Sequence, residues 1–134
     1  MSDLEYIRKR FKDDRFAVDV TGAEILSAEP GHSICEAEIR PHHLNAVNAV
    51  MGGVIFTLAD FAFAVAANTD TEIITVSQQA SVNFLSPVRG KKLIAEANVL
   101  KKGKRTSLYS VEVKDDLDTS VAYVTVTGYS LPQK

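Results

Sequence analysis

The chain has 134 residues, of which 46% are hydrophobic and 24% are charged, and its formal net charge is −2. That length is typical of one domain, and such a charge balance creates no broad field that would attract nucleic acid or a charged membrane. We therefore expect a single domain over residues 1–134, with no nucleic-acid or membrane partner.

The N-terminal segment, MSDLEYIRKRFKDDRF, is charged along its whole length. It lacks the apolar core of a signal peptide, which favours a cytoplasmic protein. Ser2 and Glu5 fit a capping box, and apolar residues recur after them at helical spacing. These features predict a short amphipathic surface helix over residues 3–13.

Two strand-like runs follow, residues 22–30 and 31–41, and they meet at a Pro-Gly pair. The second run alternates apolar with charged residues, which predicts a hairpin with one solvated face. Cys35 falls on the apolar face, where we expect it to behave as a small hydrophobic residue rather than a catalytic thiol. One cysteine and three histidines without paired-ligand spacing predict no metal site.

Residues 51–67 are rich in alanine and apolar on nearly every side, and Asn68 is a suitable C-terminal stop. A helix of this kind must be buried, and the available cover is an antiparallel sheet of about six strands wrapped around it. The sequence therefore predicts an α+β architecture with one long central helix and a short N-terminal helix.

After this helix, apolar and polar residues alternate again, as in a strand. In residues 73–88 this alternation places Val76, Ala80, Val82 and Phe84 on one face of a strand. Three more strand runs follow to residue 131, with predicted turns near Lys102-Gly103 and at residues 115–118. The order is therefore helix, two strands, long helix, four strands.

Asp60 is the only formal charge between Ala46 and Thr69. Burying an unpaired charge is costly, so this carboxylate needs either a structural partner or a chemical task. Gly52 and Gly53 begin the same helix, where free N–H groups and the positive end of the helix dipole suit an oxyanion. Asp60 lies roughly 11–12 Å further along the axis, too far to act on a carbonyl held there.

A second copy of the chain could place an aspartate close to the helix start. If the long helices of the two copies pack antiparallel at about 8–10 Å, Asp60 of one chain approaches the Gly52-Gly53 terminus of the other. The sequence therefore predicts an obligate homodimer with two shared active sites.

The stretches LNAVNAVMGGVIFTLADFAFAVAAN, VSQQASVNFLSPV and KKGKRTSLYSVEV resemble the PaaI-type thioesterases of the hotdog fold, which hydrolyse acyl-CoA thioesters. The resemblance extends over nearly the whole chain from about residue 20. It implies the hotdog fold, a homotetramer, and no cofactor, since coenzyme A is part of the substrate.

The resemblance also implies roles for particular residues. Asp60 would be the general base or nucleophile, and the Gly52 or Gly53 amide would polarise the thioester carbonyl. Asn45 would orient the substrate through a hydrogen bond. Ser77, on the following strand, would support the carboxylate or its water.

A basic cluster surrounds Gly103 at the predicted hairpin tip. One interpretation is a charged turn that discourages strand-to-strand aggregation. The other is a site for the coenzyme A phosphates, with Lys104 and Arg105 as the contacts.

The chain departs from the family pattern at Met51, where many relatives have histidine, and at Asn48, where glycine is common. Met51 is the one feature that favours an alternative function, a non-catalytic module that binds acyl-CoA or lipid. An acyl-thioester dehydratase would need a histidine against the helix carboxylate, and only His42 or His43 is available, at unsuitable spacing.

Overall fold

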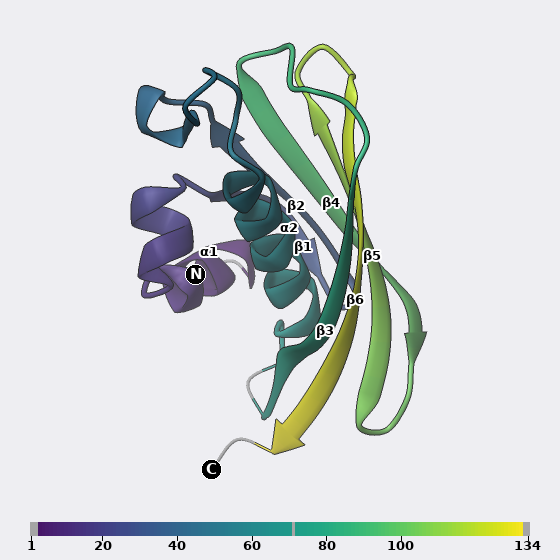
Figure 1. Cartoon of the computed structure of the whole chain (residues 1–134). Helices are drawn as coiled ribbons and strands as arrows, with labels where there is room; N and C mark the ends of the chain where they lie inside the picture. Colours follow the sequence, from purple (N-terminus) through teal and green to yellow (C-terminus); the bar gives the residue numbers. More distant parts are fainter. Residues whose placement is uncertain (1–2, 71, 133–134) are drawn as a thin grey trace.

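The computed structural model describes residues 3–70 and 72–132, and a six-stranded antiparallel sheet dominates it (Figure 1). The strands run in the order β1-β2-β4-β5-β6-β3, and α2 (Gly52–Ala67) packs against one face. The predicted α+β architecture is confirmed. The strands are β1 (Glu24–Glu29), β2 (His32–Glu38), β3 (Ile73–Phe84), β4 (Lys92–Lys102), β5 (Thr106–Asp115) and β6 (Ser120–Pro132).

Helix α2 forms the centre of the hydrophobic core, as its composition predicted. Leu58, Ala59 and Ala62 are fully buried, and the small alanine side chains allow the sheet to approach the helix closely. Burial of a leucine side chain such as that of Leu58 contributes roughly 1.5–3 kcal/mol. At the end of the helix, the Asn68 side chain bonds both the N–H and the carbonyl of Thr75, which joins α2 to β3.

The N-terminal helix α1 (Asp3–Phe11) is shorter than the predicted range, because the chain turns after Phe11. A five-residue π-helical turn, η1 (Phe16–Val20), follows it and was not predicted. The Arg8 guanidinium donates two hydrogen bonds, of 2.8 and 3.0 Å, to the Ile25 carbonyl and fastens α1 to β1. The proposed capping box rests on Ser2, which lies outside the described residues.

The β1–β2 hairpin turns at Gly31, which has a positive φ of 80° that favours glycine. Cys35 on β2 is fully buried, and this burial raises the pKa of its thiol to about 12. A thiol that stays protonated is a poor nucleophile. The structure is therefore consistent with the predicted packing role of this cysteine.

Strand β3 contains a bulge that the simple alternation did not predict. Ser77 pairs with Gly128 and Gln79 pairs with Thr127, so Gln78 is an extra residue in the strand. The bulge reverses the alternation, because residues paired directly across strands share a face. Ala80, Val82 and Phe84 share the face of buried Val124 and Val126, which is turned toward α2.

The predicted placement of Val76 with these three residues is wrong. Val76 pairs with Tyr129, on the other side of the bulge, and its side chain lies on the outer face of the sheet. The side chain of Ser77 is turned inward instead. The extra residue at Gln78 is the physical reason for both changes.

The β5–β6 turn is organised by Asp115, whose side chain is almost completely buried. Its two carboxylate oxygens accept four backbone N–H bonds of 2.8–3.0 Å, from Arg89, Gly90, Leu117 and Thr119. Burial opposes ionisation, but these donors outweigh it and hold the pKa of Asp115 well below its usual range. Asp115 thus ties the turn to the segment before β4.

Candidate active site

The start of α2 is an open helix terminus. Met51 is the N-cap residue, no side chain caps the helix, and its first turn contains no acidic residue. The first N–H groups of a helix have no partner within it, which leaves those of Gly52 and Gly53 for a ligand, whereas the Val54 N–H donates to the Met51 carbonyl. A Cβ at Gly53 would meet only the Met51 methyl group, at 3.9 Å, whereas one at Gly52 would come within 2.9 Å of the Phe84 ring. Gly53 is therefore the more accessible of the two glycines.

Asp60 lies in the middle of α2 and is half-buried. The inward turn of β3 at its bulge directs the Ser77 hydroxyl toward the Asp60 carboxylate, where a hydroxyl donor favours the ionised form of the acid. Burial is the main cause that raises the pKa of Asp60, the nearby Asp14 carboxylate raises it further, and the Ser77 hydroxyl opposes both. Asp60 is thus a carboxylate that accepts a proton more readily than an exposed aspartate.

A cavity of about 240 Å³ opens beside Asp60. Thr57 and Asp60 supply its polar lining from α2, and Asp14 supplies a carboxylate from the connection between α1 and η1. The other lining residues are apolar or aromatic: Phe16, Ala17, Phe56 and Phe61. Such a mixture of apolar walls and a few polar groups suits an acyl group held beside a reactive carboxylate.

The structure brings together only part of the predicted site within one chain. Ser77 faces Asp60, whereas the Gly52-Gly53 terminus lies about two helical turns away, roughly 11–12 Å along the helix. Asn45 does not line the Asp60 cavity, and its side-chain oxygen accepts bonds from the Val47 and Ala49 N–H groups within its own loop.

Lys104 and Arg105 lie in the exposed turn between β4 and β5. Figure 1 shows this turn at the end of the sheet where α2 ends, opposite the end where α2 begins. One chain alone therefore does not place these cations beside Gly52 and Gly53.

Asp14 and Phe16 are among the cavity residues that were not identified from the sequence. Asp14 stands in the charged run KDDRF, which resembles any solvated surface segment. Only the packing of η1 beside α2 turns it toward Asp60. No local sequence signal reports that packing.

The histidines are engaged elsewhere. The Nε2 atoms of His42 and His43 lie 3.0 and 3.1 Å from the same Val20 carbonyl oxygen, and neither residue lines the Asp60 cavity. The arrangement that a dehydratase would need is therefore absent from the described chain. No group of three or more potential metal ligands occurs among residues 3–70 and 72–132.

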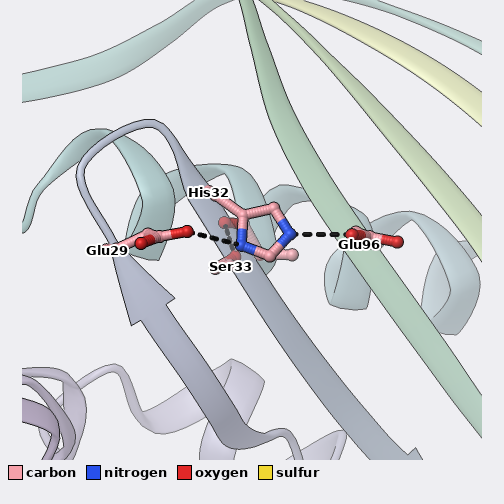
Figure 2. A network of polar contacts seen from close by, with 5 residues as sticks. Glu29, His32, Ser33 and Glu96 are labelled. Atoms are coloured by element: carbon pink, nitrogen blue, oxygen red, sulfur yellow. Dashed lines mark hydrogen bonds and ion pairs between the residues drawn. The ribbon is translucent and has the colours of Figure 1, made fainter.

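His32 belongs to a polar network on the sheet (Figure 2). It is the first residue of β2, and its ring lies between Glu29, at 3.5 Å, and Glu96, at 2.7 Å. The neighbouring Ser33 hydroxyl donates to the Ala62 carbonyl of α2. These contacts join the β1–β2 hairpin to β4 and α2, which explains the network without a catalytic role.

A family model described as the thioesterase superfamily matches residues 48–122, a range that includes Asp60, Ser77 and both glycines of the helix start. The chain belongs to the thioesterase superfamily. It is a thioester hydrolase, and its resemblance to the PaaI type is confirmed.

Individual relatives agree with this assignment. A putative esterase of Archaeoglobus fulgidus is 33% identical over 89% of this chain and 77% of its own length. The acyl-coenzyme A thioesterase PaaI of Escherichia coli is 32% identical over 75% of this chain and 72% of its own length.

Solved structures of similar proteins confirm the hotdog fold. The E. coli PaaI structure superposes with a TM-score of 0.87, at 25% identity over 96% of this chain and 94% of the other. A Streptococcus mutans protein, solved with acetyl CoA bound, has a TM-score of 0.77 at 27% identity over 84% of this chain and 90% of the other.

Proposed function

We propose that this thioesterase hydrolyses acyl-CoA thioesters to a free acid and coenzyme A, with Asp60 as general base or nucleophile. The observation that carries the proposal is the half-buried Asp60 carboxylate, which faces Ser77 and is open to a cavity lined in part by aromatic side chains. The acyl-CoA thioesterase PaaI and the acetyl CoA-bound relative support the choice of substrate.

Two routes use the same residues. In the first, Asp60 takes a proton from water while the water oxygen bonds to the thioester carbon, and collapse of the tetrahedral intermediate breaks the C–S bond. In the second, an Asp60 oxygen bonds to that carbon and expels the thiolate, and water then hydrolyses the mixed anhydride. A thiol with a pKa near 8.5 leaves readily as thiolate, so neither route needs a strong general acid.

The oxyanion is stabilised, in this proposal, by the Gly52 or Gly53 N–H of a second copy of the chain. The separation of Asp60 from its own helix start calls for that second copy. Strand β3 supports it, since β3 lies at one edge of the sheet and pairs only with β6 among the described strands. An edge strand this long is a natural place for a partner to associate.

The remaining predicted residues have supporting roles. Ser77 holds the Asp60 carboxylate, and Asn45 orders the loop that leads into α2, from which it would orient substrate. Lys104 and Arg105 would bind coenzyme A phosphates. We further propose that dimers pair into a homotetramer in the cytoplasm. Among the described residues, no helix combines the length and the apolar character needed to cross a membrane.

Thiol release from a panel of aromatic and aliphatic acyl-CoA esters tests the chemistry. The Asp60→Asn variant should lose hydrolysis while still binding the ester. Retained hydrolysis in this variant would contradict the role of Asp60. Binding of esters without any turnover by the native protein would favour the alternative of a non-catalytic binding module.

A mixing experiment tests the shared site. Asp60→Asn and Gly53→Val homodimers should each be inactive, whereas refolding them together should restore activity to about a quarter of the native value. Recovery is expected because a mixed dimer contains one site with a native Asp60 from one chain and a native Gly53 from the other. If each chain held a complete site, mixing would restore nothing. Light scattering on the same samples reports dimer or tetramer mass.

A further inference from the structure

The Asp60 cavity contains a second carboxylate, that of Asp14. The backbone holds Asp14 in place on both sides, because its N–H donates to the Phe11 carbonyl at 3.0 Å and its carbonyl accepts from Val18 at 2.9 Å. The side chain lines the same 240 Å³ cavity as Asp60. Two acidic groups from distant parts of the sequence therefore face one small space.

No positive charge among the described residues balances them there. Thr57 of α2 lines the cavity with a neutral hydroxyl, which donates to the Gly53 carbonyl, and the Ser77 hydroxyl that acts on Asp60 from β3 is neutral as well. The neighbouring cation on the Asp14 segment, Arg15, is exposed and does not line the cavity. The space that would receive the acyl group thus combines aromatic walls with two negative charges.

We propose that Asp14 is a specificity-determining residue, which with Asp60 restricts the cavity to acyl groups that carry no charge and helps to expel the carboxylate product. This inference rests on the proposed function. A thioester is neutral at its reacting end, so the two carboxylates tolerate it. An acyl group that ends in a carboxylate, and the free acid formed by hydrolysis, would each bring a third negative charge into the cavity.

The first test compares two substrates of nearly the same shape. Glutaryl-CoA ends in a carboxylate, and 5-methylhexanoyl-CoA carries an isopropyl group at the same place. The native enzyme should strongly prefer the neutral ester in kcat/KM. In Asp14→Asn this preference should narrow by about three- to tenfold, the range expected for a charge interaction at a few ångströms in a partly solvated site.

Two control variants isolate the effect. Asp13→Asn removes the same charge from the same exposed segment, but Asp13 does not line the cavity. It should leave the ratio unchanged, which separates a local effect from the general attraction of anionic coenzyme A esters. Asp14→Glu keeps the charge and should keep the native preference.

Product inhibition gives a second measurement. The carboxylate product, 5-methylhexanoate, should inhibit Asp14→Asn at about three- to tenfold lower concentration than it inhibits the native enzyme. An unchanged substrate ratio and unchanged inhibition in Asp14→Asn would overturn the inference. An equal change in Asp13→Asn would overturn it as well.

These outcomes are distinguishable from failure of the proposed function. If Asp60→Asn is inactive but Asp14→Asn keeps the native substrate ratio, only the role of Asp14 is wrong. If Asp60→Asn remains active, the assigned chemistry of Asp60 is wrong, whatever Asp14 does.

Discussion

Asp115 and Asp60 are both withdrawn from solvent, yet their environments act on their charges in opposite directions. Asp115 accepts four backbone N–H bonds, and its pKa lies well below the usual range. Asp60 has the Ser77 hydroxyl as a partner, faces a second carboxylate, and its pKa is raised. Burial disfavours both charges, so the number and kind of partners determine the direction of each shift.

Asp115 thus has a structural role, whereas Asp60 has the environment of the chemical role that we propose for it. The charge of Asp115 is fully used within the protein, and Asp115 does not line the cavity beside Asp60. The charge of Asp60 is only partly satisfied and is open to a cavity. An incompletely satisfied carboxylate that a ligand can reach is a candidate for proton transfer or nucleophilic attack.

The largest expected effect is on activity at Asp60. Asp60→Asn should lower kcat by about a thousandfold, because the amide can neither accept the proton nor attack the carbonyl. Its free energy of unfolding should equal or exceed the native value, since a half-buried charge is removed. Thiol-release kinetics and denaturant unfolding of the same preparation measure the two quantities. A strongly destabilised but active variant would reverse the distinction between the aspartates.

Asp115→Asn should show the opposite pattern. We expect it to lower the free energy of unfolding by about 2–4 kcal/mol, because its amide NH₂ group would face N–H donors, while kcat remains close to native. The exposed Asp118 of the same turn forms a 3.4 Å ion pair with Lys114, and Asp118→Asn should cost less than about 1 kcal/mol.

The Asp115→Asn variant also tests how the stability of the protein depends on pH. A pKa lowered by folding means that Asp115 stabilises the protein above about pH 4, and that this contribution is lost as the pH falls below the pKa of the unfolded chain. The native protein should therefore lose stability on acidification more steeply than Asp115→Asn. Parallel acid dependences of the two proteins would show that the charge of Asp115 is not what the four donors stabilise.

The smallest expected effects are shifts in the pH dependence of kcat/KM, in opposite directions for Ser77→Ala and Asp14→Asn. The rising limb of kcat/KM follows ionisation of Asp60, since only the carboxylate accepts a proton. Ser77→Ala removes a hydroxyl donor that lowers the pKa, so this limb should move to higher pH, with about a three- to thirtyfold loss of activity at neutral pH. Asp14→Asn removes a like charge, so its limb should move to lower pH. Shifts in the same direction would contradict the assigned causes.

Much of the fold could be predicted from the sequence, because it depends on local patterns. The uniformly apolar segment that became α2 identified a buried helix, and the period-two runs identified the strands around it. The helix start was recognisable from its pair of glycines, Gly52 and Gly53. Asp60 was recognisable because a lone charge in an apolar segment calls for an explanation.

The rest depends on contacts between distant segments. The inward turn of Ser77 requires the register of β3 on β6, and alternation within β3 alone gives the opposite face. Asp14 reaches the cavity only because η1 packs beside α2. Neither arrangement leaves a signal in the neighbouring residues.

The bulge at Gln78 also has a consequence for how this strand can evolve. Inward and outward residues alternate in opposite order on the two sides of the bulge. Before it, Thr75 and Ser77 present hydroxyls to the inside, while Ile74 and Val76 present aliphatic side chains to the outside. If the extra residue were relocated before Ile73, Gln78 would face Asp60 and the two aliphatic side chains would turn inward. The residue that faces Asp60 and the outer surface of β3 would then change in a single event, without the replacement of any amino acid.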